Sequence, residues 1–258
     1  MLSKFSVYFL LPTAFLLFFP FAANAQKHRS RIRPLLKKPF VNSPASKYRT
    51  PVPAVVIEEK LAVLRFEPSL IAIPMQRMRA GRSVSITGER QVEGVTFYRV
   101  QLPPDKSGWV QAQALASNAR PGDDERLAKL IRVFDGFEQL ELASIFLENF
   151  PKSTFRPAIL LLVGDLAEEA AQEVSRAALR KLDANEMQAS GAPVHSFYLN
   201  FNGLDRYRKV GINFVFNLNV KQFHYDGAVW LEILQKHSGD TEALEARKRL
   251  DSLALQMK

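Results

Sequence analysis

The chain of 258 residues contains no cysteine. This absence excludes disulfide bonds, thiolate nucleophiles and cysteine-based metal sites, so ordinary side-chain packing must hold the fold. Histidine is also scarce, and no two of its four positions have HExxH or HxH spacing: His28, His195, His224 and His237. Because zinc needs three or four nitrogen, sulfur or oxygen ligands, the sequence predicts no metal site and no cofactor.

The signatures of common catalytic sites are missing as well. There is no GxSxG elbow for a serine hydrolase, and the 12 glycines are dispersed without a phosphate-binding loop. Adjacent carboxylates occur at Asp123-Asp124 and at Glu168-Glu169, but neighbouring side chains on a helix point in different directions and cannot face one scissile bond. We interpret these pairs as helix-start and solvent-facing residues. The sequence therefore predicts a noncatalytic protein, with a cell-wall hydrolase of unfamiliar site as the less favoured alternative.

The first 25 residues have the pattern of a secretory signal peptide. Lys4 precedes an uncharged apolar run over residues 5–23, and Ala23 and Ala25 supply the small residues of a cleavage site before Gln26. An uncleaved membrane anchor is the alternative, because the run is about long enough to cross a bilayer. Both interpretations predict export, to the periplasm or the cell envelope.

The formal net charge of +9 comes from the N-terminal part of the chain. Residues 26–53 hold eight basic and no acidic residues, whereas residues 54–258 hold 26 of each kind. A basic, proline-rich segment cannot bury enough apolar surface to fold alone, so residues 26–53 are predicted to be a disordered linker. The folded part is formally neutral, which argues against a nucleic-acid partner. We interpret the linker as a solvated tether; contact with anionic lipid head groups is the functional alternative, through Arg29, Arg31, Arg33, Lys37 and Lys38.

Short apolar runs separated by turn residues predict a small β-domain over residues 54–117. Val84 and Ile86 alternate with polar residues, which turns one face of their strand toward a core. Tyr98 alternates with Phe97, so we expect at most one of them to face that core. Strands are predicted at residues 54–57, 62–66, 83–87, 96–102 and 108–111.

This segment resembles the bacterial SH3 domain. The resemblance rests on three motifs: Leu64-Arg65 followed by Pro68-Ser69, Met78 followed by Gly81 and Val84, and the terminal Gly108-Trp109-Val110. Met78 stands where that family usually has leucine. The resemblance implies an SH3-like β-barrel that recognises cell-wall peptide or another protein. Because aromatic faces stack on sugar rings and peptide side chains, the candidate binding residues are Tyr98, Arg99 and Trp109, with packing inside the barrel as the alternative role of Trp109.

Helical spacing predicts an α-helical domain over residues 122–258, with Asp123 capping its first helix. Later helices are expected over residues 137–150 and, from residue 153 onward, up to residue 182. A loop to Pro193 is expected to follow. Residues 146–154 parallel residues 233–241, since in each an apolar helix ends, a short turn follows and a capping residue begins the next helix. This parallel resembles the helix-turn-helix unit of tetratricopeptide-like repeats, which implies a surface for a partner protein.

One segment of this helical part has a period of two residues instead. Apolar and polar residues alternate over residues 212–218, and residues 222–225 supply a return strand, which predicts an inserted β-hairpin. The predicted class is thus α+β multidomain, with an SH3-like barrel followed by a helical, repeat-like domain. We expect a noncatalytic binding or scaffold protein of the cell envelope, with an accessory subunit of a membrane-associated assembly as the alternative.

Overall fold

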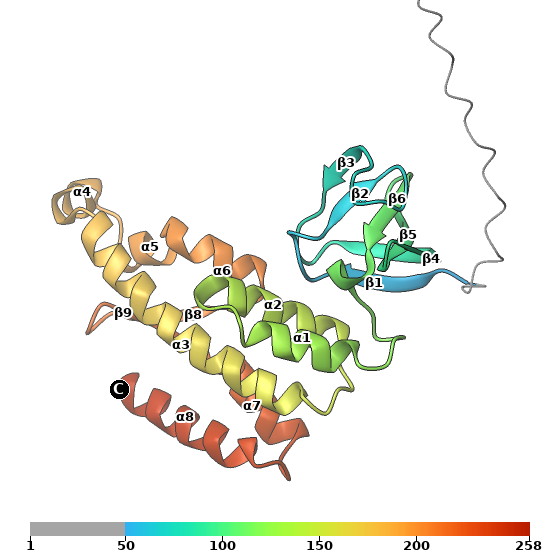
Figure 1. The fold of residues 1–258 in the computed structure, drawn as a ribbon. Coiled ribbons are helices and arrows are strands. Elements are labelled where there is room, and N and C mark those ends of the chain that lie inside the picture. The colour runs from blue at the N-terminus through green and yellow to red at the C-terminus, as the bar shows by residue number, and fades with distance from the viewer. Residues whose placement is uncertain (1–49) are drawn as a thin grey trace, which may run out of the picture. The chain divides into compact units, whose positions relative to one another are not determined.

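The computed structural model describes residues 50–258, which lie in one compact unit. An antiparallel sheet comes first, and helices with a two-stranded hairpin follow (Figure 1). The predicted signal peptide, residues 26–49 of the predicted linker and its five predicted lipid-contacting cations lie outside the described residues. Within residues 50–258, no helix combines the length and apolar character needed to cross a membrane.

The sheet has seven strands in the order β3-β2-β6-β5-β4-β1-β7. They are β1 (Val52–Val56), β2 (Val63–Arg65), β3 (Pro74–Arg77), β4 (Ser83–Val92), β5 (Val95–Leu102), β6 (Lys106–Gln111) and β7 (Leu115–Ala116). The edge strands β3 and β7 do not pair with each other, so the sheet is open and not closed into a ring of strands. Strands β3 and β7 were not expected from the sequence, and β1 begins two residues before the predicted domain boundary.

The predicted alternation does build the core of the sheet. Val84, Val100 and Val110 are buried on one face, together with Leu64. Gly108 allows β6 to approach β2 closely, because a Cβ atom there would lie 2.8 Å from the Arg65 carbonyl oxygen. Any larger residue would push the two strands apart, so this glycine fixes the position of the β6 residue that follows it.

The helices are α1 (Asp123–Ile131), α2 (Gly136–Asn149), α3 (Arg156–Lys181), α4 (Ala184–Ser190), α5 (Val194–Leu199), α6 (Asp205–Lys209), α7 (Ala228–Lys236) and α8 (Glu242–Gln256). Two predictions about them are wrong. Gly122 occupies the cap position of α1, and Asp123 is its first helical residue. The expected loop between residue 182 and Pro193 contains α4, because Asp183 caps α4 by accepting hydrogen bonds from the backbone N–H groups of Asn185 and Glu186, and Gly191 ends it in a left-handed conformation.

The two parallel segments of the sequence form matching turns, one between α2 and α3 and the other between α7 and α8. Each turn uses the same backbone hydrogen bonds, donor first: Phe150 to Phe146 and His237 to Ile233 (2.9 and 2.8 Å), then Ser153 to Phe150 and Asp240 to His237 (3.2 and 3.0 Å). The residues at the cap positions, Phe155 and Thr241, accept no side-chain capping bond, whereas Ser153 Oγ, two residues before Phe155, accepts the Phe155 N–H at 3.2 Å. The two helix pairs therefore share the backbone geometry of their turns.

The predicted hairpin is confirmed as β8 (Phe214–Asn217) and β9 (Gln222–Tyr225), which pair antiparallel. Its aromatic residues pack on the helices. The Phe216 ring stacks on Tyr198 of α5 with centroids 4.4 Å apart, and Phe214 meets Tyr207 of α6 edge to face at 5.3 Å. These contacts make the hairpin part of the helical core.

The sheet and the helices share apolar packing. Val55, Ile57 and Ala116, from the sheet and its flanks, belong to the same buried cluster as Leu127 of α1 and Ile145 of α2. Both hydrophobic clusters consist of residues that follow Pro44, so a chain beginning at Pro44 is expected to fold on its own.

An ion pair joins α3 to α7. The Arg156 Nη2 atom lies 2.8 Å from the Glu232 Oε1 atom, and Lys236 lies 3.5 Å from the same oxygen. Burial raises the pKa of the Glu232 carboxyl, but the hydrogen bond and charge of Arg156, with Lys236, outweigh it and hold that pKa below its ordinary value of 4.5. Because the folded state has the lower pKa, the pair stabilises the protein fully above about pH 4.5 and ceases to do so as the pH falls below that value.

Replacing Glu232 by glutamine is therefore expected to flatten the acid side of the stability profile. The free energy of unfolding, measured by urea titration at pH 7 and at about pH 3, should fall less for Glu232→Gln than for the unmodified chain. Glu125→Gln, which removes an exposed carboxylate 2.6 Å from Lys129 on α1, is the control and should leave the profile nearly unchanged. Parallel profiles for the Glu232 variant and the unmodified chain would contradict the assigned ion pair.

Candidate functional site

Three side chains lie side by side on the outer face of the sheet. Trp109 of β6 is paired directly with Arg99 of β5 on one side and with Arg65 of β2 on the other. Directly opposed residues of neighbouring strands have their Cβ atoms about 5 Å apart. Trp109 and Arg65 are half-buried and Arg99 is exposed. We call Arg65, Trp109 and Arg99 the outer-face row; it presents an indole between two guanidinium groups.

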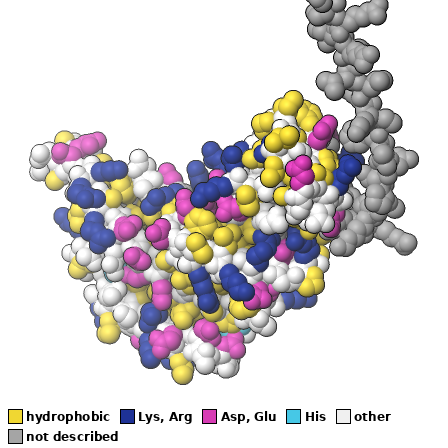
Figure 2. Space-filling model, in the orientation of Figure 1, with side chains coloured by type: hydrophobic (Ala, Val, Ile, Leu, Met, Phe, Trp, Pro, Cys, Tyr) yellow, Lys and Arg dark blue, Asp and Glu magenta, His cyan; other side chains and the backbone are white. Residues whose placement is uncertain are grey.

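An apolar loop adjoins one end of this row. Residues 66–73, which we call the apolar loop, connect β2 to β3, and the Arg65 Nη1 atom donates a 2.7 Å hydrogen bond to the Ala72 carbonyl oxygen within it. Its large side chains face solvent, with exposed fractions of 95% for Ile71, 71% for Ile73 and 63% for Phe66. Hydrophobic side chains gather over the region of β2 and β3 in Figure 2. Exposed apolar residues that cluster in this way mark interaction surfaces.

The sequence-predicted binding residues do not all belong to this surface. Tyr98 is only 6% exposed and packs in the core of the sheet, with the Arg120 guanidinium carbon 4.8 Å from its ring centroid. Phe97 is also buried, at 1% exposed, but it lies on the other face of β5 and outside this core cluster, so one of the two residues faces the core, as expected. Of the three predicted residues, the structure brings Arg99 and Trp109 together on the outer face and places Tyr98 on the opposite face.

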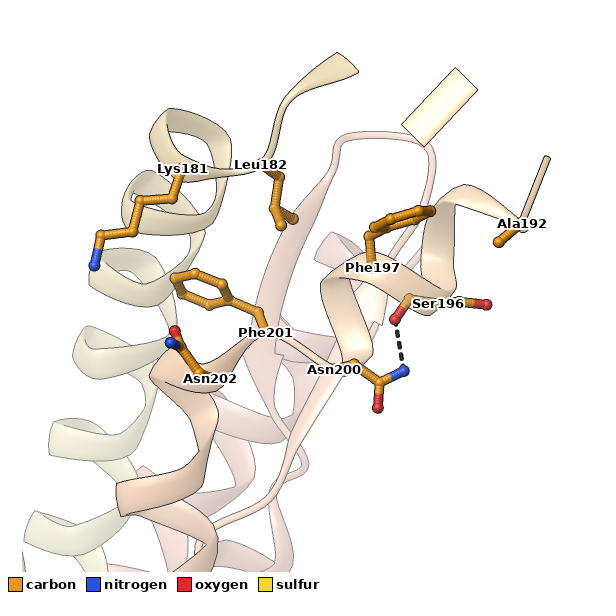
Figure 3. A pocket seen from close by; sticks show the side chains of 8 residues that line it. All are labelled: Lys181, Leu182, Ala192, Ser196, Phe197, Asn200, Phe201 and Asn202. Carbon is orange, nitrogen blue, oxygen red and sulfur yellow. Dashed lines mark hydrogen bonds between the residues drawn. The ribbon is translucent and has the colours of Figure 1, made fainter. Parts of the chain in front are cut away.

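A second surface lies in the helical region, where the end of α3 meets α5. Figure 3 shows Leu182, Phe197 and Phe201 around a cavity of about 580 Å³, with Lys181 and Asn202 at its margin. We call this cavity the apolar groove. Other aromatic residues of the helical region are core residues: Tyr198, Tyr207 and Trp230 are each 2% exposed. Phe197, by contrast, keeps access to solvent.

A carboxylate and a histidine form a partly buried pair between α3 and β9. The His224 Nδ1 atom lies 2.9 Å from Glu168 Oε1, and the backbone N–H of Tyr225 donates to Glu168 Oε2 at 2.8 Å. His224 is packed in the core, and Glu168 is not the solvent-facing residue that was expected; Glu169 is exposed.

The nearby hydroxyl of Ser175 does not turn this pair into a catalytic triad. Ser175 Oγ donates to the Ala171 carbonyl oxygen at 2.7 Å and accepts from the Phe223 N–H at 2.8 Å. The hydroxyl is therefore already used as both hydrogen-bond donor and acceptor toward backbone groups. These bonds hold β9 against α3. In the part of the chain that the structure describes, no three His, Asp or Glu side chains gather in a way that could hold a metal ion.

Sequence reasoning missed Arg65 and the apolar loop. Arg65 belongs to the motif that carried the SH3 resemblance, but its place beside Trp109 depends on the register between β2 and β6. The sequence signal for the loop was the run Leu70-Ile71-Ala72-Ile73, in which no polar residue alternates with the apolar ones and no turn residue occurs. Comparison with protein-family models, curated proteins and solved structures finds no match for this chain.

Proposed function

We propose that the protein is a noncatalytic binding protein of the cell envelope, in which an SH3-like sheet recognises a carboxylate-bearing cell-wall peptide and a repeat-like helical region serves as a scaffold. The observation that supports this proposal is the outer-face row. Arginine pairs with carboxylates through two parallel hydrogen bonds, and an indole face stacks on apolar parts of a peptide. Cell-wall peptides carry both free carboxylates and short aliphatic side chains.

The apolar loop extends the same surface. Arg65 donates a hydrogen bond to the Ala72 carbonyl oxygen of the apolar loop. This bond keeps the exposed Ile71 and Ile73 side chains next to the outer-face row. A ligand that crosses the row meets charge and aromatic surface first and aliphatic surface next. A central aromatic and arginine cluster with an apolar neighbour is typical of residues that dominate binding energy at interfaces.

The helical part supports the scaffold role. The matching turns between α2 and α3 and between α7 and α8 agree with a pair of related helix-turn-helix units, as in tetratricopeptide-like repeats. Export of the chain, and contact of its basic N-terminal residues with anionic lipid, belong to the same proposal and rest on the sequence.

The test is binding of the Pro44–Lys258 chain to isolated peptidoglycan and to soluble peptide fragments of it. Trp109→Leu and Arg99→Gln are each expected to weaken binding by about 2 kcal/mol, or roughly thirtyfold, as measured by isothermal titration. Amidating the peptide carboxylates should weaken binding to the unmodified chain by a similar factor and have little further effect on Arg99→Gln.

Arg247→Gln is the matched control, because it removes an exposed guanidinium from α8, outside the sheet. Thermal unfolding of each variant shows whether the sheet remains folded. Full binding by both Trp109→Leu and Arg99→Gln would rule out the outer-face row as the site, and cleavage of the fragments would replace a binding function by a hydrolytic one.

A further inference from the structure

The helical region has a second hollow beside the apolar groove, and its lining is cationic. This hollow, of about 550 Å³, lies between α3 and α6, and we call it the cationic groove. Its charged lining residues are four cations and one carboxylate: Arg176, Arg180, Lys181 and Arg206, with Glu173. Dark-blue Lys and Arg side chains gather near the α4 end of α3 in Figure 2.

These four cations have no ion-pair partner among the described residues. Arg176 and Arg180 stand four residues apart on α3, an arrangement in which like charges repel and destabilise a helix. Some exposed cations elsewhere on the helices are neutralised, as Lys129 is by Glu125 and Lys248 is by Glu245, and those that are not, such as Arg247 on α8, do not line this hollow. The concentration of unneutralised charge in one hollow therefore indicates an anionic ligand.

Arg206 is held in position for such a ligand. Its guanidinium carbon lies 4.6 Å from the centroid of the Tyr207 ring and 5.0 Å from that of Phe137, and Nη2 donates to the Tyr207 hydroxyl at 2.6 Å. Stacking on two rings fixes the plane of the guanidinium without neutralising it. The remaining N–H groups of Arg206 stay available for an anion, because guanidinium carries five donors.

The cationic groove and the apolar groove are contiguous. Lys181, Phe201 and Asn202 line both of them. The Lys181 ammonium lies 6.0 Å from the Phe201 ring centroid, at the border between charged and apolar lining. Across that border, Leu182 and Phe197 present aliphatic and aromatic surface (Figure 3). Each hollow is of the size that holds a small ligand or a segment of one.

We propose that the two grooves together bind a single phosphate-bearing amphiphile, with its anionic head group among Arg176, Arg180 and Arg206 and its acyl chain in the apolar groove. Several unpaired cations suit a phosphate, which has multiple acceptor oxygens, and the adjoining apolar surface suits a hydrocarbon chain. This site is separate from the outer-face row and does not depend on the function proposed for it.

The test is titration of the Pro44–Lys258 chain with short-chain lysophosphatidylglycerol below its micelle concentration. Binding should be at least tenfold tighter than that of lysophosphatidylcholine of the same chain length, which is zwitterionic. It should also be at least tenfold tighter than that of glycerol phosphate, which has the head group alone. Equal binding of the two lipids would refute the cationic half of the proposal, and equal binding of lipid and glycerol phosphate would refute the apolar half.

Variants separate the two halves further. The double change Arg176→Gln with Arg180→Gln should weaken binding of the anionic lipid at least tenfold. Arg132→Gln with Arg247→Gln removes the same charge from exposed positions elsewhere and should have no such effect. Phe197→Ser should weaken lipid binding about tenfold and leave glycerol phosphate binding unchanged. If the Arg176 and Arg180 variant, still folded by circular dichroism, binds the lipid as tightly as the unmodified chain, the site is not the cationic groove.

Discussion

Replacing Asp123 by alanine is expected to lower the free energy of unfolding by about 3 kcal/mol, the largest single effect that we predict. The Asp123 side chain is 5% exposed and lies where the sheet joins α1. It accepts the Ser117 backbone N–H at 2.9 Å and lies 3.1 Å from Arg126 Nη2 and 3.4 Å from Arg120 Nε. Arg126 in turn donates to the carbonyl oxygens of Gln113 and Leu115, at the end of the sheet.

Alanine at this position would leave one buried N–H and two partly buried cations without their acceptor. Removing one member of a buried ion pair costs about 3–5 kcal/mol, and the lower value applies because Arg120 and Arg126 keep 25% and 35% of their side-chain exposure. Urea titration gives the total loss. Hydrogen exchange should place it in the amides of β7 and the first turn of α1.

Two variants show which property of Asp123 is responsible. Asp123→Asn keeps an acceptor for Ser117 but removes the charge, and we expect it to lose about half as much stability. Asp124→Ala removes the neighbouring carboxylate, whose hydrogen bond is to Ser153 Oγ at 2.7 Å, and should cost less than about 1 kcal/mol. Equal losses of stability for Asp123→Ala and Asp124→Ala would show that the contacts of Asp123 between the sheet and α1 stabilise the fold no more than the hydrogen bond of Asp124 does.

Replacing Gly164 by alanine is expected to destabilise the protein by about 2 kcal/mol. A Cβ atom at this position in α3 would lie 2.2 Å from Nε1 and 2.5 Å from Cε2 of Trp230. Trp230 is 2% exposed and cannot move aside without displacing α7 from α3. Alanine is favoured over glycine inside a helix by about 1 kcal/mol, so propensity alone predicts the opposite sign. The clash outweighs propensity, because overpacking a buried site costs about 1–3 kcal/mol or more.

The matched control is Gly239→Ala, in the turn between α7 and α8, where nothing lies within 4 Å of the added atom. This variant should change the free energy of unfolding by less than about 0.5 kcal/mol. Urea titration followed by tryptophan fluorescence measures both variants. A Gly164→Ala protein that is more stable than the unmodified chain would mean that Trp230 does not pack on α3.

The elements that the sequence predicted are those whose signal is local. The alternation of Val84 and Ile86 was enough to predict β4, and the two-residue period over residues 212–218 predicted the hairpin inside a helical region. Strand β3 was missed because Pro74–Arg77 has little alternation and becomes a strand by pairing with β2 at the edge of the sheet. Asp183 and Gly191 were interpreted as loop residues, although the same residue types also begin and end short helices.

The site was only partly predictable for the same reason. Trp109 was recognised because it lies within a motif, Arg99 was named with it as a candidate binding residue, and their juxtaposition follows from the short connection between β5 and β6. Arg65 joins them through the pairing of β2 with β6, which a single sequence does not specify. Burial of Tyr98 was undetermined, since alternation separates the two faces of a strand but does not say which face is covered. The cationic groove combines residues of α3 and α6, which only the tertiary fold brings together.

The most direct test of the outer-face row uses the two tryptophans of the chain as reporter and reference. Trp109 lies in the row, and Trp230 is buried against α3. In an NMR titration of the Pro44–Lys258 chain with a carboxylate-bearing cell-wall peptide, we predict that the Trp109 indole N–H resonance shifts and saturates while that of Trp230 stays in place. A saturating titration in which the Trp109 resonance does not move would contradict the account.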